Sequence, residues 1–173
     1  MAISEDWLLP AALVEVATVE FDYDDGNGID YEPFAEFKPA EENRFWWPLW
    51  TGKPDLDGAE FRVFGMDGTG GYSAFWLVRN GQPLTSQPIV FLGSEGEVGV
   101  VARDLADFLW LLADGFGPLE AVEYPERPAR PQRELTEIAE RYAADRRASA
   151  ATVIAAARTE FPDFERTIME LCR

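Results

Sequence analysis

The strongest strand-forming pattern of the chain lies in its middle third. Four runs rich in β-branched and aromatic residues are separated by short turns that contain glycine; they span residues 61–66, 72–79, 88–92 and 98–102. Runs of this length and composition are typical of two consecutive β-hairpins. The last three runs are apolar at odd and even positions alike. Both faces of the resulting sheet should therefore be covered by other elements.

Glycine marks the two turns inside these hairpins. Gly68, Gly70 and Gly71 separate the first two runs, and Gly93 and Gly96 separate the last two. Because glycine adopts backbone conformations that other residues avoid, we expect these five residues to shape tight turns.

A helix is predicted directly after the last strand, over residues 105–114. Asp104 is a suitable N-cap, Asp107 stands at the capping-box position, and Gly115 occupies the place favoured at a helix C-terminus. Asp107 and Asp114 are expected opposite the apolar face, which should lie flat on the sheet. That face comprises Leu105, Phe108, Leu109 and Leu112.

The order of these segments resembles that of the SMI1/KNR4 family, also called the SUKH superfamily. The resemblance covers roughly residues 34–122 and rests on the turn 67–71, two apolar strands, the turn 93–96, a further strand and the helical segment 104–112. It implies an α+β domain. Many members are bacterial immunity proteins that bind and neutralise a toxin, so the resemblance also implies a non-catalytic protein-binding module without a cofactor.

The N-terminal part is expected to add another hairpin, with a strand over residues 13–21, an acidic loop that ends at Asn27 and Gly28, and a return over 29–37. Asp22, Asp24 and Glu32 have part of the spacing of a calcium-binding EF-hand loop. Gly26 and Asn27 stand where that loop needs Asp or Asn and then Gly, and no flanking helices are predicted. A solvated acidic turn is therefore the preferred interpretation.

Three tryptophans follow at Trp46, Trp47 and Trp50, in a short helix expected to begin at Pro39 and to stop before Pro48. Packing of their rings on the sheet is the main expectation, and contact with a partner is the alternative.

The C-terminal region is expected to be helical. We divide the chain into an SMI1/KNR4-like domain (1–124), a proline-rich connector (125–131) and a helical extension (132–173). The extension has apolar residues at helical spacing from Glu134 to about Arg158, and a final short helix after Pro162. Its apolar stripe should dock on the domain or on a second copy, so a homodimer is also considered. The predicted fold is therefore α+β, a mainly antiparallel five- or six-stranded sheet with packed helices plus a C-terminal helical tail.

Composition narrows the functional classes. Apolar residues make up 47% and aromatic residues 13% of the 173 residues, as in a packed globular protein. Fifteen basic and 32 acidic side chains give a net charge of −17. This charge repels nucleic acid and anionic membranes and favours a basic protein partner. The chain has no apolar run long enough to span a membrane and no signal-peptide pattern, so a cytoplasmic location is expected.

The missing residue types exclude much catalytic chemistry. The chain has no histidine, and its single cysteine is Cys172. Histidine-dependent hydrolases, histidine zinc sites and internal disulfides are therefore excluded. The main functional hypothesis is an immunity-type module that binds a basic toxin. A small enzyme that uses two carboxylates and a structural protein that dimerises through its C-terminal helices are the alternatives. The candidate partner-binding residues are Asp22, Asp24, Asp25, Asp67, Glu95, Trp46, Trp47 and Trp50.

Overall fold

The computed structural model describes residues 7–172, which fold into an α+β domain around one antiparallel sheet. The five strands follow one another in chain order across the sheet, and each pairs antiparallel with the next. This confirms the predicted fold class. The strands are β1 (Glu32–Pro33), β2 (Phe61–Met66), β3 (Tyr72–Trp76), β4 (Ile89–Leu92) and β5 (Val98–Ala102).

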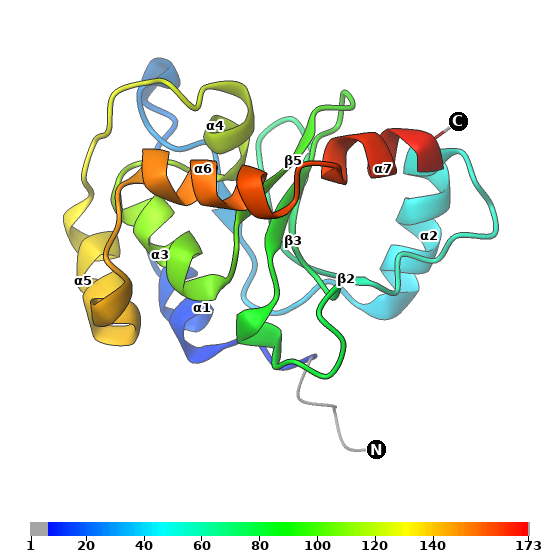
Figure 1. Cartoon of the computed structure of the whole chain (residues 1–173), viewed down its shortest axis with the longest axis horizontal. Helices are drawn as coiled ribbons and strands as arrows, with labels where there is room; N and C mark the ends of the chain where they lie inside the picture. The colour runs from blue at the N-terminus through cyan, green and yellow to red at the C-terminus, as the bar shows by residue number, and fades with distance from the viewer. Residues whose placement is uncertain (1–6, 173) are drawn as a thin grey trace.

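Helices cover both faces of this sheet (Figure 1). In the view of Figure 1, α1, α3, α4 and α5 lie to the left of the strands, α2 and α7 lie to the right, and α6 runs past the edge strand β5. The helices are α1 (Ala11–Val16), α2 (Ala40–Thr51), α3 (Leu105–Ala113), α4 (Pro118–Glu123), α5 (Arg133–Ala143), α6 (Ala150–Glu160) and α7 (Phe164–Leu171).

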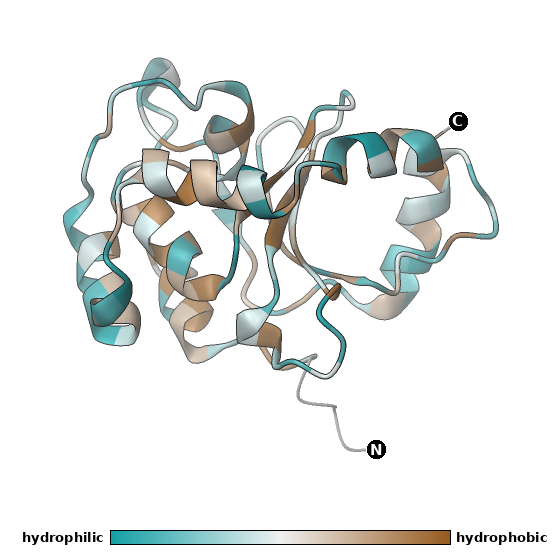
Figure 2. Cartoon of the chain, in the orientation of Figure 1, coloured by the Kyte–Doolittle hydropathy of each residue, from teal (hydrophilic) through white to brown (hydrophobic). Residues whose placement is uncertain are grey.

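Successive strand residues supply two separate hydrophobic cores. Phe64 and Phe75 face the core beneath α1, α3 and α5, whereas Val63 and Ala74 face the core beneath α2 and α7. This alternation follows from the two-residue period of a strand. Figure 2 shows the hydrophobic colours concentrated along the strands and α3, with hydrophilic colours on α5. The expectation that both sheet faces are covered is therefore confirmed.

Helix α3 matches its prediction in position and in capping. The Asp104 side chain accepts a hydrogen bond from the backbone N–H of Asp107 at 2.9 Å, and Gly115 follows with φ +91°. The expected exposure of Asp107 is wrong. Because α5 and α6 both pack against α3, Asp107 is buried, where its carboxylate pairs with Arg103 at 2.8 Å and Arg146 at 2.9 Å.

The N-terminal hairpin is wrong. Residues 11–16 form α1 instead of the first strand, and the described chain between α1 and β1 contains no strand. Pro10 is the N-cap of α1, and Leu13 and Val16 are one helical turn apart, so both are buried against α3 and α5. Of the described residues before β2, the short β1 is the part that joins the sheet, where it pairs with β2.

The predicted end of the tryptophan helix is also wrong, because α2 continues through Pro48 to Thr51. It ends at Gly52, whose φ of +75° is left-handed. Proline inside a helix removes one backbone hydrogen bond and costs about 3 kcal/mol. Burial of Trp47 and Thr51 beside it on the sheet offsets that cost.

The long helix expected over residues 134–158 is two helices, α5 and α6, which are separated by the 3₁₀ helix η4 (Ala144–Arg146). Arg146 pairs with Asp104 and Asp107 of α3, and Ser149 caps α6. These contacts hold the turn that lets both helices pack on α3. The apolar stripe of the tail is buried within the chain: Leu135, Ile138, Ala139, Val153, Ile154, Ala157, Phe164 and Ile168.

Candidate functional site

The two hairpin turns and the acidic loop of residues 22–28 meet at one end of the sheet. The backbone N–H of Gly68 donates to the Asp30 carboxylate at 2.8 Å, which ties the β2–β3 turn to the segment before β1. The Ser94 hydroxyl donates to the Thr69 hydroxyl at 3.2 Å, which joins the β2–β3 and β4–β5 turns. The structure thus brings together three segments that are far apart in the sequence.

A pocket of about 270 Å³ opens between these turns and α4. We call it the acidic pocket, because its lining has five carboxyl groups against one basic side chain, Arg127. Its volume is slightly below the range of about 300–1,000 Å³ typical of small-molecule sites. The carboxylates are those of Asp30, Glu95, Glu97, Glu120 and Glu123.

The Arg127 guanidinium donates its hydrogen bonds to backbone carbonyl groups rather than to these carboxylates. Its guanidinium donates to the carbonyl oxygens of Gly28 at 2.8 Å, Gly26 at 3.3 Å and Gly115. Arg127 therefore fastens the acidic loop to the α3–α4 connection. Within residues 7–172, no ion pair joins Glu95, Glu97 or Glu123 to a basic side chain.

Glu120 forms the buried wall of the acidic pocket. Its carboxylate accepts the N–H of Gly117 at 2.9 Å and the N–H of Asp30 at 3.2 Å. The first bond closes the N-terminus of α4 on itself, and the second holds the segment that leads to β1. Burial raises the pKa of Glu120 to about 7, although both hydrogen bonds and the charge of Arg127 oppose the rise. Both oxygens of Glu120 are thus engaged in holding the fold.

Glu123 shows the effect of crowded negative charge at the mouth of the same pocket. Desolvation raises its pKa, and the neighbouring charges of Glu97, Asp67 and Glu95 raise it further. Like charges disfavour the ionised form of a carboxyl group, so a cation placed among them would be stabilised.

Two exposed tyrosines border the acidic pocket. Tyr23 on the acidic loop is 57% exposed, and Tyr124 at the end of α4 is 56% exposed. Tyrosine rings combine a large apolar area with a polar tip and are frequent in the centres of protein interfaces.

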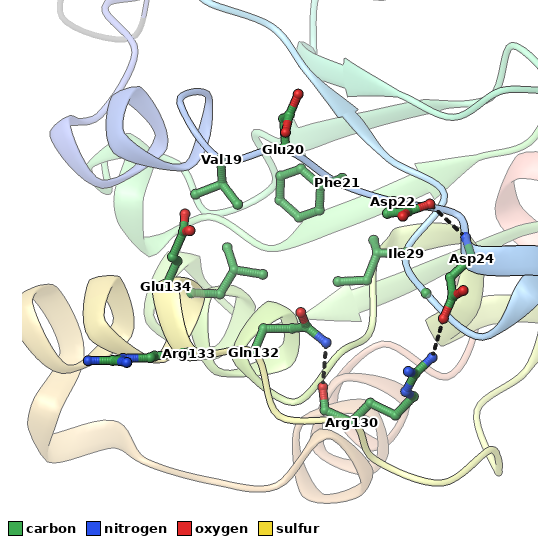
Figure 3. A pocket seen from close by; sticks show the side chains of 12 residues that line it. Val19, Glu20, Phe21, Asp22, Asp24, Ile29, Arg130, Gln132, Arg133 and Glu134 are labelled. Atoms are coloured by element: carbon green, nitrogen blue, oxygen red, sulfur yellow. Dashed lines mark hydrogen bonds and ion pairs between the residues drawn. The ribbon is translucent and has the colours of Figure 1, made fainter.

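The predicted residues of the acidic loop lie beside this pocket rather than in its lining. Asp24 pairs with Arg130 at 3.1 Å, and Asp22 accepts the backbone N–H of Asp24 at 2.9 Å. Both line a second hollow of about 500 Å³ between the loop and the start of α5 (Figure 3). Asp24 and Asp25 have positive φ values of 46° and 50°. Asp25 is exposed beside Tyr23 and Asp24.

Of the two acids predicted from the hairpin turns, only Glu95 is exposed in the pocket. The expectation that Asp67 projects from its turn is wrong, because this residue is 2% exposed. Its carboxylate accepts the backbone N–H groups of Thr69 at 2.7 Å and Gly71 at 3.2 Å, and so holds the turn together. A Cβ atom at Gly71 would lie 2.8 Å from the same carboxylate, which explains the glycine there.

The three tryptophans pack on the opposite face of the sheet. Trp47 is fully buried against Phe61, with ring centroids 4.8 Å apart, and takes no part in an exposed surface. Trp46 and Trp50 are half-buried and stack on each other at 5.9 Å. The indole N–H of Trp50 donates to the Gly93 carbonyl at 2.9 Å, so this ring is hydrogen-bonded to the β4–β5 turn.

Sequence reasoning missed most of the acidic pocket's lining. One local signal was available for Glu120, because Gly117 and Pro118 precede it as an N-cap and a first helical residue should. Glu97 closes the β4–β5 turn through its carbonyl oxygen, which accepts the Gly93 N–H at 2.7 Å, whereas only the packing of α4 against β4 and β5 brings Glu123 to the turns.

Comparisons with known protein families, curated proteins and solved structures yield no match. Within residues 7–172, no cluster of three or more potential ligand side chains is arranged to hold a metal ion. The helices of this part are too short or too polar to cross a lipid bilayer.

Proposed function

We propose that the domain is a non-catalytic protein-binding module whose acidic pocket receives a basic side chain of a protein partner. The observation that carries the proposal is the convergence of five carboxylates from separate segments on one small pocket. The only basic residue of its lining, Arg127, donates its hydrogen bonds to backbone carbonyls.

Electrostatics supports a cationic partner. Carboxylates held close together without neutralising ion pairs repel one another, and an incoming guanidinium or ammonium group relieves that repulsion. The chain's net charge of −17 would also speed the approach of a basic protein.

The dimensions and the border of the acidic pocket support a side chain rather than a free small molecule. Its volume of about 270 Å³ is suited to the end of one long residue. The exposed rings of Tyr23 and Tyr124 offer faces on which an arginine or lysine can lie. We therefore place Tyr23, Glu95, Glu97, Glu123 and Tyr124 at the partner interface.

Toxin neutralisation is the form of this function that we propose, on the basis of the resemblance to the SMI1/KNR4 family. Such a protein would act by covering a basic surface of the toxin, and would need no cofactor. Asp25 would contribute from the edge of the same interface, since it is exposed beside Tyr23.

The test begins with capture of partners from lysates of the source organism on the immobilised protein, followed by their identification and expression. Association rates are then measured at low and physiological salt. We expect the wild-type rate to fall at least tenfold as salt rises, because attraction between opposite charges is screened. A toxic partner should also stop inhibiting growth when it is co-expressed with this chain.

A matched pair of variants locates the binding site. Glu97→Gln/Glu123→Gln and the control Glu134→Gln/Glu170→Gln each change the net charge equally, from −17 to −17 + 2 = −15. Glu134 and Glu170 are exposed and lie outside the acidic pocket. We expect the pocket variant to weaken affinity more than tenfold and the control to change it less than threefold. Equal effects of the two variants would rule out the pocket as the site of contact.

A further inference from the structure

The outer edge of β5 presents backbone hydrogen-bonding groups beside the acidic pocket. β5 is the last strand of the sheet and pairs with β4 on its inner side. The Gly93 N–H donates to the Glu97 carbonyl at 2.7 Å, so the Glu97 carbonyl is directed at β4. Bonding directions alternate along an antiparallel strand. Gly99 is therefore also directed at β4, whereas Val98 and Val100 direct their N–H and C=O groups outward.

These outward groups have no partner within the described chain. Among residues 7–172, no further backbone or side-chain group is hydrogen-bonded to the outward N–H or C=O of Val98 or Val100. Each residue offers one donor and one acceptor. An open strand edge of this kind is a template on which another extended chain can pair.

A groove of about 610 Å³ lies along this edge, between α4 and the connection from α6 to α7. In Figure 1, β5 lies between α4 and α7, and both helices contact it. The volume is within the range of about 300–1,000 Å³ typical of ligand sites. Because helices stand on both sides, the edge is more accessible to a single extended segment than to the edge of another folded sheet.

The α4 side of the groove is acidic. Glu97 and Glu123 line both this groove and the acidic pocket, so the two hollows are continuous. Gly99 faces the same side, since a Cβ atom there would lie 3.0 Å from the Val122 side chain. A long side chain placed opposite Gly99 would therefore extend past Val122 towards the two carboxyl groups.

The α7 side of the groove is apolar. Val98 and Val100 direct their side chains into the core beneath α2 and α7, where they belong to the same cluster as Phe164, and half-buried Phe161 packs against that cluster. Both rings line the groove. Over the whole lining, three carboxyl groups face one basic side chain, Arg158. A strand added to β5 would alternate its side chains between the two sides, in step with β5 itself.

We propose that a short extended segment of a basic protein partner adds to β5 as a sixth strand, antiparallel to it. Its alternate residues are basic, directed at Glu97 and Glu123, and apolar, directed at Phe161 and Phe164. The inference rests on the proposed function, because the acidic pocket receives one of these basic side chains. The antiparallel direction continues the pairing of the whole sheet and is the more stable of the two.

A second copy of this chain fits the groove less well than a basic segment. Pairing of β5 with the β5 of another copy would bring together the like charges of Glu97, Glu123 and Glu165. Each copy also carries a net charge of −17. Like charges on neighbouring strands are destabilising, whereas a basic segment would relieve the repulsion that is already present.

Titration calorimetry with a short blocked peptide of alternating lysine and valine tests the proposal. Two further peptides of the same charge are N-methylated, one at every valine and the other at every lysine. In the antiparallel register the valines are opposite Val98 and Val100 and exchange hydrogen bonds with them. Methylation of the valines should therefore weaken binding more than tenfold, and methylation of the lysines less than threefold. Attraction to net charge alone would affect all three peptides equally.

Amide hydrogen exchange of the full chain, followed by NMR, locates the added strand without any substitution. The unmodified peptide should slow exchange of the Val98 and Val100 amides at least tenfold, because their N–H groups acquire acceptors. The Gly99 amide is the internal control, since it is directed at β4 in the free protein and should change little.

Three results would overturn strand addition: no binding of the unmodified peptide up to about 1 mM, equal binding of the two methylated peptides, or Val98 and Val100 amides that stay unprotected in the complex. Stronger loss from methylated lysines would overturn the antiparallel register. Dimers of the free protein that protect the same amides would assign the edge to a second copy.

Failure of the acidic pocket gives a different result. Glu97→Gln/Glu123→Gln and its control Glu134→Gln/Glu170→Gln are titrated with the same unmodified peptide. Equal affinity of the two variants would contradict the pocket as the site of the basic side chain, while protected Val98 and Val100 amides would still establish the added strand. The reverse combination, a weakened pocket variant with unprotected amides, would retain the proposed function and remove the strand.

Discussion

Helices α3 and α2 cover opposite faces of the same sheet, yet they differ in how far their hydrophobic residues are buried. Nearly all of α3 is buried, including Asp107. Helix α2 buries Trp47 and Thr51 on its inner face but exposes Phe45 and Leu49 on its outer face. Almost every residue of α3 is therefore part of a core, whereas α2 contributes only its inner face.

The difference arises from what lies outside each helix. Helix α3 lies between the sheet and α5, and α6 packs beside it on both α3 and β5. No described helix packs on the outer face of α2, as the exposure of Phe45 and Leu49 shows. An apolar residue of α3 thus contributes to folding, whereas Phe45 and Leu49 of α2 remain exposed to solvent.

The largest expected effect is at Leu109 on α3. Leu109→Ala should lower the free energy of unfolding by about 2–5 kcal/mol, because it opens a cavity between the sheet and the outer helices. Chemical denaturation monitored by circular dichroism measures the change. A loss below about 1 kcal/mol would contradict the assignment of α3 as a fully buried layer.

An intermediate effect on the free energy of unfolding is expected at Glu120. It tests whether water is excluded from the α3 side of the sheet. The pKa of this carboxyl group is about 7 in the folded protein, against an ordinary value of 4.5. The folded state therefore holds the proton more tightly than the unfolded state. The resulting stabilisation is complete below about pH 4.5 and is lost as the pH rises through 7, by up to about 3 kcal/mol.

Glu120→Gln should remove that part of the pH dependence. The amide is neutral at every pH, so the decline in stability between pH 5 and pH 8 should be smaller than in the wild type. Because the amide nitrogen would face one of the two backbone N–H donors, the slopes are compared rather than the absolute stabilities. The exposed Glu134→Gln is the control. Equal slopes in all three proteins would show that Glu120 is not held in a dry environment.

The comparison also explains how much of the fold the sequence predicts. The strands β2–β5 and helix α3 have local signals that agree with their final environment, such as the Asp104 cap and the glycine turns. The strand expected over residues 13–21 failed because Leu13 and Val16 fit a helical face equally well. A short apolar run does not distinguish a strand from a helix until its neighbours are known.

The candidate site follows the same logic. The exposure of Glu95 was predicted because it lies in a glycine-flanked turn, and such a turn between two strands can be recognised from the neighbouring residues in the sequence. Asp67 stands in an equivalent turn, but its carboxylate folds inward to hold Thr69 and Gly71. Glu97, Glu120 and Glu123 were missed because their meeting depends on where α4 packs, which no pattern within α4 specifies.

The smallest expected effect on the free energy of unfolding is that of a leucine-to-alanine substitution on α2. Leu49→Ala removes as many atoms as Leu109→Ala, but the Leu49 side chain is 71% exposed and leaves no cavity. Alanine is also a slightly better helix former than leucine, so the free energy of unfolding of the monomer should change by less than about 0.5 kcal/mol. Denaturation is measured by circular dichroism under the same conditions as for Leu109→Ala. A loss above 1 kcal/mol would mean that Leu49 packs within its own chain, and the contrast between the buried α3 and the exposed outer face of α2 would then fail.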